Sequence, residues 1–171
     1  VGARTADETR AVYETVVRLK NSKGKKTERE VELTTLFLGM LARNFSPSDE
    51  HFSGIVKQLT ELAVKPSLSV QLAVSSCFSN MTSLPDAMGL AESLFDTLVS
   101  QPDASSRRGV CYAIAGIVKA RGLPSMYETG FYERRIRAPL VARDAEAKAR
   151  RLTSETAAAC GAAYHLLQAL A

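Results

Sequence analysis

Residues 107–122 read RRGVCYAIAGIVKARG, and the apolar side chains in this stretch recur at the spacing of one helix face. They occupy positions i, i+3, i+4, i+7 and i+8, namely Val110, Ala113, Ile114, Ile117 and Val118. This spacing predicts an amphipathic α-helix with one buried face. Because such a stripe cannot be buried alone, the helix needs neighbours of the same kind.

Similar stripes precede this stretch. One comprises Val70, Ala73, Val74, Cys77 and Phe78, and an earlier one comprises Leu33, Leu36, Phe37, Met40 and Leu41. The three stripes begin 37 and 40 residues apart, and each follows a shorter helical segment and a tight turn. A helix–turn–helix unit that recurs about every 40 residues is typical of HEAT or armadillo arrays. Two helices per unit, rather than three, favour HEAT.

The sequence therefore predicts an all-α, HEAT-like α-solenoid of about four antiparallel helix pairs. The expected helices span residues 6–20, 28–44, 49–63, 67–82, 87–100, 105–121, 126–142 and 145–170. They form repeats at about 6–44, 49–82, 87–121 and 126–170, and the second helices, which begin near Glu28, Ser67, Ser105 and Thr153, should make one layer. We expect residues 1–171 to be a single slab of a much larger protein, because apolar stripes continue to both ends.

The segment 126–142 fits the helical pattern least well. Its apolar residues are loosely spaced, at Met126, Phe131, Ile136 and Leu140. Pro139 is expected to end or kink a helix there. Elsewhere, a hydroxyl residue followed three positions later by Glu predicts a capped helix start, at Thr5–Glu8, Thr27–Glu30 and Ser125–Glu128.

The composition is that of a globular protein, with 46% hydrophobic and 23% charged residues. No apolar run reaches the roughly 18 residues of a membrane helix, and the N-terminus lacks a basic-then-apolar signal region. The three cysteines, Cys77, Cys111 and Cys160, are widely spaced and fit no metal-ligand pattern. These features predict a cytoplasmic protein with reduced thiols and no membrane segment.

Charge is distributed unevenly along the chain, whose net charge is +4. Residues 1–43 hold nine basic and six acidic side chains, and residues 44–104 hold two basic and seven acidic ones. Residues 107–151 hold eleven basic and four acidic side chains. An acidic middle between two basic ends is more informative than the total, because it points to the ends as the places that an anionic partner would contact.

Motifs of catalysis and cofactor binding are absent from the sequence, which has no P-loop, no G-x-G-x-x-G, no H-E-x-x-H and no C-x-x-C. The two histidines, His51 and His165, stand in separate predicted helices and are expected to be structural or solvated. We therefore expect no enzyme activity, no metal or other cofactor, and no small-molecule substrate.

The basic residues are the candidate functional side chains, as contacts to an anionic surface such as RNA. The candidates are Arg107, Arg108, Arg134, Arg135, Arg137, Arg143, Lys148, Arg150, Arg151, Lys23, Lys25 and Lys26. Arg107 and Arg108 are unusual because they open a helix, where the helix dipole disfavours cations. Two interpretations stay open: these residues pair with acidic groups or form a solvated face, or they neutralise RNA phosphates without reading bases.

The stretch from Arg107 to Gly122 resembles one helix of a known family, the general-control translational activators, which are very large HEAT-repeat proteins of eukaryotes. The family helix has one or two basic residues, a Gly, small residues, a Tyr and an Ala-Gly-apolar-Val-Lys-Gly-apolar-Gly ending, which this sequence matches through Lys119 and again at Gly122. Residues 66–77 and 37–49 resemble the two preceding family repeats. The similarity covers residues 36–122 best, in a region that is also similar to the HEAT part of fungal elongation factor three.

The resemblance implies a non-catalytic scaffold segment of a ribosome-associated translational activator. Family members attach to ribosomes, work with an ABC-type ATPase partner and relay stress or stalling signals to the protein kinase of initiation factor two alpha. Nothing in this sequence matches the family's kinase-binding segment. The residues alone also allow a second function, that of a generic HEAT-repeat adaptor for another protein's helix or tail.

Overall fold

The computed structural model describes residues 6–22, 24–149 and 153–171, and in these ranges the chain is all-α, with no strand. The helices are α1 (Ala6–Asn21), α2 (Glu28–Ala42), α3 (Glu50–Ala63), α4 (Leu68–Ser79), α5 (Ala87–Ser100), α6 (Ala104–Arg121), α7 (Pro124–Glu128), a π-helix η1 (Tyr132–Arg137), α8 (Ala138–Lys148) and α9 (Ser154–Leu170). The predicted all-α class is confirmed, and no described helix combines the length and the apolarity required to cross a bilayer.

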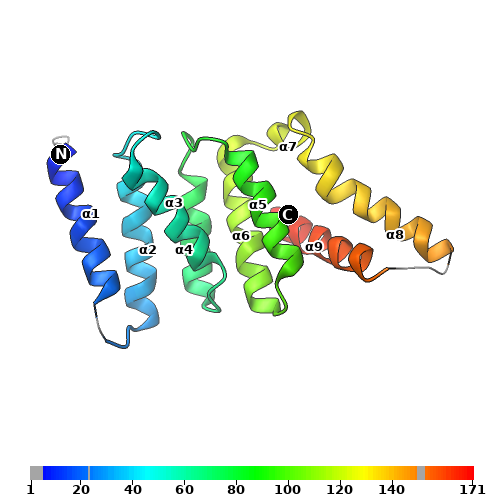
Figure 1. The fold of residues 1–171 in the computed structure, drawn as a ribbon, viewed down its shortest axis with the longest axis horizontal. Coiled ribbons are helices and arrows are strands. Elements are labelled where there is room, and N and C mark those ends of the chain that lie inside the picture. The colour runs from blue at the N-terminus through cyan, green and yellow to red at the C-terminus, as the bar shows by residue number, and fades with distance from the viewer. Residues whose placement is uncertain (1–5, 23, 150–152) are drawn as a thin grey trace.

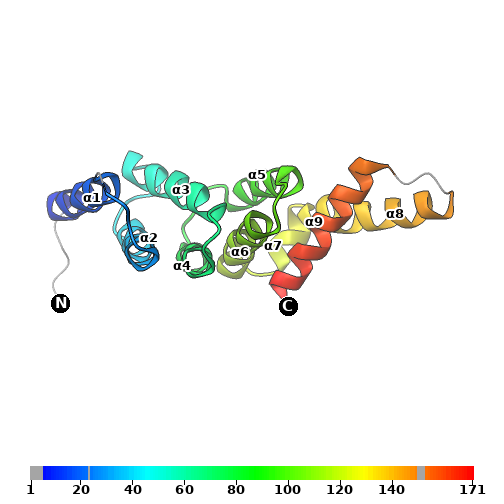
Figure 2. The same ribbon diagram turned by 90° about the horizontal axis from the view of Figure 1, so that it is seen from below.

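The helices stand side by side in a row that starts at α1, as Figure 1 shows. Seen along the helices in Figure 2, α2, α4 and α6 make one layer, and α1, α3 and α5 make the other. The helix α9 packs against α6 and also contacts α5, because it lies obliquely across both layers in Figure 2. The layer predicted for the second helix of each pair is therefore confirmed for α2, α4 and α6 but not for α9, in an all-α helical repeat arrangement.

Side-chain caps fix where the helices begin. The predicted capping box is present at Thr27, whose hydroxyl accepts from the Glu30 backbone N–H while the Glu30 carboxylate accepts from the Thr27 N–H. Asp49, Ser67, Asp103 and Thr153 also cap their helices. The box predicted at Ser125–Glu128 is wrong, because α7 begins one residue earlier and has no side-chain cap. Thr5 of the third expected box lies outside the described residues.

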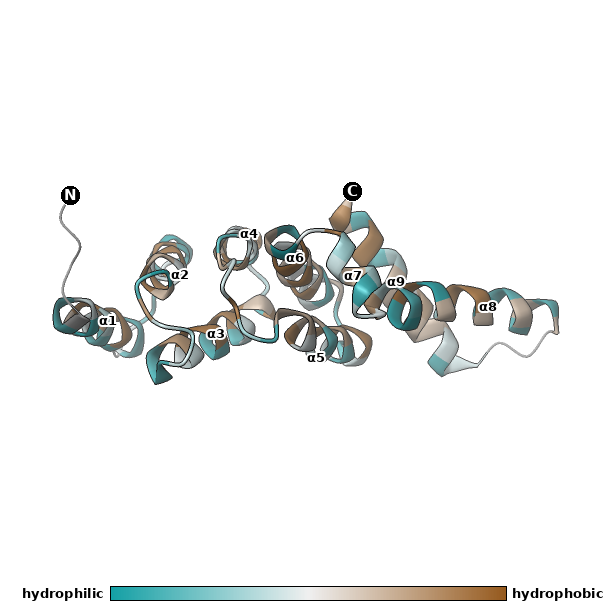
Figure 3. Ribbon diagram, turned by 90° about the horizontal axis from the view of Figure 1, so that it is seen from above, coloured by the Kyte–Doolittle hydropathy of each residue, from teal (hydrophilic) through white to brown (hydrophobic). Residues whose placement is uncertain are grey.

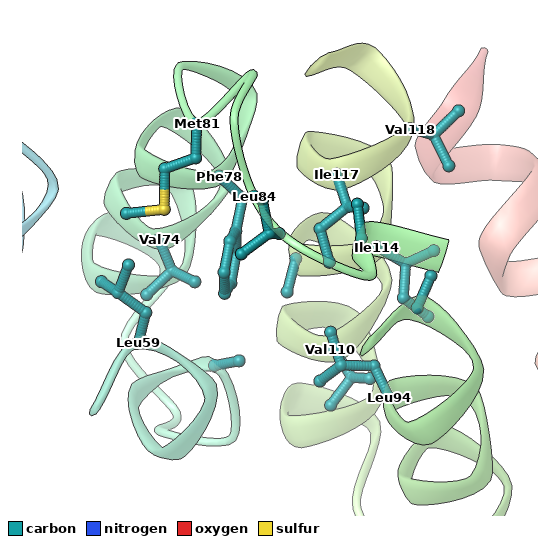
Figure 4. Close-up of a cluster of buried hydrophobic side chains, with 14 of the residues drawn as sticks. Leu59, Val74, Phe78, Met81, Leu84, Leu94, Val110, Ile114, Ile117 and Val118 are labelled. Carbon is teal, nitrogen blue, oxygen red and sulfur yellow. The ribbon is translucent and has the colours of Figure 1, made fainter. Parts of the chain in front are cut away.

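The core is one continuous cluster that runs through the repeats. Figure 4 shows its central part, where side chains of α4, such as Phe78, face those of α6, such as Ile114 and Ile117. All three of these side chains are fully buried, as the stripes on α4 and α6 predict. The extensive packing of α4 on α6 shows that each pair buries its apolar stripe against its neighbours, as expected for a stacked array.

The predicted apolar face of α2 is partly wrong. Leu33, Phe37 and Met40 are exposed by 40%, 51% and 61%, whereas Leu38 is fully buried. The helix α4, the neighbour of α2 in the same layer, packs on the side of α2 where a Cβ on Gly39 would meet Cys77. Leu33 and Phe37 line a groove shared with α1, whereas Met40 lines a pocket beside Ser76 of α4. The hydropathy colouring in Figure 3 shows brown residues around α2.

The first half of the last repeat departs most from the prediction. Its buried residues Met126, Phe131 and Ile136 are spaced five apart, which is the period of a π-turn. The chain accordingly forms η1 and continues into α8 without a break at Pro139. The predicted helix end there is wrong, because the i→i+5 hydrogen bonding before Pro139 leaves room for the ring that a regular α-helix would exclude.

The boundary between the last two helices is also corrected. The sequence predicts one helix over 126–142 and another from residue 145, but α8 continues to Lys148 and α9 begins at Ser154. Among its described side chains α8 has none that is buried, and Figure 1 shows this helix pointing away from the row. The segment η1–α8 is therefore the most protruding helical part of the described chain.

Glycines allow the helices of the first layer to approach closely. A Cβ on Gly116 of α6 would lie 2.4 Å from the Ser75 carbonyl oxygen of α4, and one on Gly109 would lie 2.0 Å from the Ala63 carbonyl oxygen. Real Cβ atoms do not come this close to backbone, so a side chain at Gly116 would force α6 away from α4, and one at Gly109 would force it away from the end of α3. By contrast, a Cβ on Gly161 of α9 would have no neighbour within 4 Å.

This difference gives a matched pair of variants. Gly116→Ala should lower the free energy of unfolding by about 1–3 kcal/mol, because the added methyl overpacks the α4–α6 contact. Gly161→Ala should leave it unchanged or raise it by up to about 1 kcal/mol, because alanine is the better helix former. Chemical denaturation of both variants checks the prediction, and equal effects would contradict the close approach.

A second stability prediction concerns Ile114, which is fully buried in the middle of α6. Ile114→Ala should destabilise the fold by about 2–5 kcal/mol, because it removes buried methyl groups and leaves a cavity between two repeats. Val141→Ala on the exposed face of α8 serves as the control. A change within experimental error for Ile114→Ala in denaturant unfolding would show that the side chain does not lie in the core.

Candidate functional site

Hydrogen bonds connect neighbouring repeats close to the places where the basic residues lie. Ser105 Oγ donates to the Pro66 carbonyl over 3.0 Å, and Ser106 Oγ donates to the Val64 carbonyl over 2.9 Å. The partners are 39 and 42 residues apart, one repeat length. Polar groups about 40 residues apart in the sequence therefore face one another at the contact between neighbouring repeats, which we call a joint. A basic side chain at a joint can form hydrogen bonds or ion pairs with the previous repeat.

Arg134 and Arg135 are satisfied in this way, at the joint between η1 and α5. Arg134 Nη2 lies 2.7 Å from Glu92 Oε1, and Arg135 Nε donates to the other Glu92 oxygen. Arg135 Nη1 lies 2.9 Å from Asp96 Oδ1, and its guanidinium stands 5.5 Å from the centre of the Phe95 ring. These two arginines therefore hold the last repeat onto α5, which favours the inter-repeat pairing interpretation for them.

The electrostatics of this joint agree with its geometry. Partial burial would raise the pKa of the Glu92 carboxyl, but the hydrogen bonds and charges of Arg135 and Arg134 outweigh it and hold that pKa below its usual value. Glu92 is about one-fifth exposed, so the pair is shielded from solvent on one side. Part of the contrast between the acidic middle and the basic C-terminal third is thus neutralised inside the fold.

Arg107 and Arg108 are held by neutral groups instead. Arg107 Nη1 donates to the carbonyls of Gln101 and Pro102, over 3.1 and 2.9 Å. Arg108 Nε donates to Gln71 Oε1 over 2.9 Å. Among the described residues neither arginine has a carboxylate within ion-pair distance, so pairing with acidic groups, one of the two interpretations left open by the sequence, is not formed for them.

Gln71 is a functional neighbour that the sequence pattern did not reveal. Its side chain is fully buried, and Nε2 donates to the carbonyls of Lys65 and Ser105, over 2.6 and 2.9 Å. With its Oε1 holding Arg108, it links the end of α3 to the start of α6. A glutamine within the apolar run of residues 68–78 was the available signal, since buried polar groups must find partners.

In the turn before α2, Lys26 contacts the end of α1 whereas Lys25 is exposed. Lys26 is half-buried, and its ammonium group donates to the carbonyls of Leu19 and Lys20 at the end of α1. A cation at a helix C-terminus satisfies carbonyls that lack partners, so Lys26 has a structural role. Lys25 is exposed, and Lys23 lies outside the described residues.

The remaining candidates lie on or near the protruding segment η1–α8. Arg137 pairs with Glu133 one turn away, and Arg143 Nη2 lies 3.2 Å from Asp144 Oδ1, with all four side chains more than half exposed. Lys148 is exposed at the end of α8. Arg150 and Arg151 lie outside the described residues. Exposed ion pairs of this kind contribute little to stability, so their basic side chains can leave the present carboxylates and bind a partner at little cost in free energy.

The candidates therefore do not gather into one surface. Lys25 and the segment η1–α8 lie at opposite ends of the row in Figure 1, and Arg107 and Arg108 lie between them at the start of α6. Of the described candidates, Lys26, Arg134 and Arg135 are engaged within the fold. Lys25, Arg137, Arg143 and Lys148 remain as exposed charges, and Arg107 and Arg108 line a groove of their own.

The cysteines and histidines show no arrangement for catalysis. All three cysteines are buried free thiols, and burial raises the pKa of Cys77 to about 11 and that of Cys111 to about 12. The His51 ring stacks on Phe45 at 5.3 Å and Nδ1 lies 2.7 Å from Asp49, which is a structural arrangement. In the described part of the chain, no three His, Cys, Asp or Glu side chains gather to hold a metal ion.

The Glu92 joint predicts a pH-dependent stability. Its folded-state pKa lies below that of the unfolded chain, so its interactions stabilise the fold above the unfolded-state value and are lost as the pH falls through the folded-state value. Glu92→Gln should therefore lower the free energy of unfolding by about 1–3 kcal/mol at neutral pH. The free energies of unfolding of variant and wild type should converge as the pH falls through the folded-state pKa of Glu92.

Glu133→Gln is the matched control, because it removes the partner of Arg137 at a site more than half exposed. It should change stability little at any pH. If Glu133→Gln destabilised the chain as much as Glu92→Gln does, or if the effect of Glu92→Gln persisted in acid, the joint would not depend on this carboxylate.

Comparison with curated proteins gives relatives over about half of this chain. It is 33% identical to "Protein ILITYHIA" of Arabidopsis thaliana over 101 residues, or 58% of the chain. It is 31% identical to the human "Stalled ribosome sensor GCN1" over 93 residues, and 31% identical to the "eIF-2-alpha kinase activator GCN1" of Saccharomyces cerevisiae over 103 residues. The predicted resemblance to translational activators is confirmed at this level.

Each match spans only about 4% of the relative's own length. No family model matches the chain. No solved structure matches it either. The similarity to fungal elongation factor three stays a prediction.

Proposed function

Given that this chain is similar over half its length to proteins named as a stalled-ribosome sensor and a kinase activator, we propose that it is a non-catalytic scaffold segment of a ribosome-associated translational activator. The whole protein would relay stress or stalling signals to the kinase of initiation factor two alpha, in the cytoplasm, together with an ABC-type ATPase partner. The similarity to these relatives is the observation that carries the proposal.

The architecture supports a scaffold role. A row of stacked helix pairs presents long exposed surfaces, and stacked repeats can continue at either end. Since the chain spans about 4% of its relatives' length, we propose that residues 1–171 form one slab of a longer HEAT array. The relatives' names describe sensors and activators rather than enzymes, which agrees with a non-catalytic role.

For the ribosome contact we propose the segment η1–α8. Phosphate binding depends on Lys and Arg side chains that can leave their present partners. Arg143 and Lys148 are exposed on α8, whereas Arg134 and Arg135 are engaged by Glu92. Arg137 could exchange its exposed partner Glu133 for a phosphate at little cost. The proposed contact is thus narrower than the basic C-terminal third as a whole.

Co-sedimentation of the full chain with purified ribosomes tests this proposal. The charge reversals Arg143→Glu and Lys148→Glu together should reduce the bound fraction and lower the slope of binding against salt by about 2, because two phosphates are then no longer neutralised. Measurements over about 50 to 200 mM salt cover the range in which electrostatic binding to phosphates dominates affinity.

The double variant Lys57→Glu and Lys65→Glu is the control, since both lysines are exposed and lie in the acidic middle of the chain. It should sediment as wild type does. An equal reduction in both double variants would make the effect one of net charge alone. Binding of wild type no higher than background would support the generic adaptor over the ribosome scaffold.

A further inference from the structure

A groove of about 380 Å³ lies between the first two turns of α6 and the C-terminal half of α9. Its polar rim comprises Arg107, Arg108, Tyr112, His165 and Gln168. We propose that this groove binds an acidic segment of a partner protein, in which carboxylates meet the two arginines and an apolar side chain enters between the helices. The groove belongs to neither the core nor the proposed ribosome contact.

The first argument for an acidic partner is the positive charge of the groove. Two arginines stand side by side at the start of α6 and lack a carboxylate within ion-pair distance among the described residues. The nearest acidic residue along the chain, Asp103, caps the helix by accepting from the Ser106 backbone N–H over 2.7 Å. The groove is thus electropositive and complementary to carboxylates.

The second step is that both arginines are already held in place. Arg107 is fixed by the Gln101 and Pro102 carbonyls, and Arg108 is fixed by the fully buried Gln71. A guanidinium has five N–H donors, so each arginine keeps free donors for a carboxylate. Because the side chains lose little freedom on binding, more of the interaction energy appears as affinity.

The form of the groove favours a peptide over RNA. Arg107 is half-buried and held against two backbone carbonyls, so its guanidinium reaches outward less than that of a free arginine. Between the arginines and α9 the floor is made of small side chains, Ala104, Cys111 and Ala169. Planar guanidinium groups match carboxylates in bidentate geometry, and the floor accepts an apolar side chain.

Fluorescence anisotropy with the full chain tests the proposal, using a short labelled peptide of alternating leucine and glutamate as the probe. Wild type should bind this peptide and should bind its leucine–glutamine analogue much more weakly. Arg107→Glu should weaken binding at least about tenfold, which corresponds to about 1.4 kcal/mol. An acidic residue in the first turn suits the helix dipole, so this variant should fold.

His165→Glu is a second variant, at an exposed position on α9, and it should also weaken binding. Lys57→Glu on α3 makes the same change of sign away from the groove and should bind as wild type does. Preferential binding of a labelled oligouridine RNA that Arg107→Glu abolishes would overturn the proposal in favour of a phosphate contact. Unchanged peptide affinity in both groove variants would also overturn it.

Discussion

The close approach of α4 to α6 is the contact on which the rest of the structure depends. Gly116 lets the two helices approach backbone to backbone, Gly109 lets α6 approach Ala63 at the end of α3, and the apolar stripes of α4 and α6 then close over Phe78 and Ile114. Neither helix pair could bury its apolar stripe alone, because within a single hairpin the stripe is covered on one side only. The row of helices is therefore stabilised at its joints rather than within each repeat.

Polar groups follow the same repeat length as the apolar ones. Glu28 accepts hydrogen bonds from Ser67 and Ser69, which follow it by 39 and 41 residues, and these bonds hold the pKa of its carboxyl below the usual value. Glu92 receives Arg134 and Arg135 from 42 and 43 residues further on. A charged side chain that has no partner nearby in the sequence can thus be paired with a group of the neighbouring repeat. Only the charged side chains outside such contacts between repeats are available to bind other molecules.

The sequence predicts the central repeats well and the outer ones poorly, for a physical reason. The stripes of α4 and α6 are covered on both sides, so almost every apolar residue in them is buried. The helix α2 has a layer neighbour on one side only, and its pattern does not show which side that is; Phe37 is exposed for this reason. The five-residue spacing of Phe131 and Ile136 does indicate the π-turn, but it does not fit the three- and four-residue spacing by which an α-helix is recognised.

The candidate site could be predicted in its residue types but not in its partners. Arg134 and Arg135 stand out by charge density, yet their engagement by Glu92 depends on the register of η1 against α5, which no local pattern contains. The repeat length would have pointed to Glu92, since it lies one repeat before them. Gln71 was missed because a single polar residue in an apolar run looks like an exposed position, although it is fully buried.

Hydrogen–deuterium exchange of the chain, free and bound to ribosomes, tests the central functional claim most directly. Among its described residues α8 has no buried side chain, so its amides should exchange readily in the free chain and any protection should be easy to detect. We predict new protection confined to residues 132–148 when ribosomes are present. Protection of α3 to α5 instead, in the acidic middle of the chain, would contradict the account.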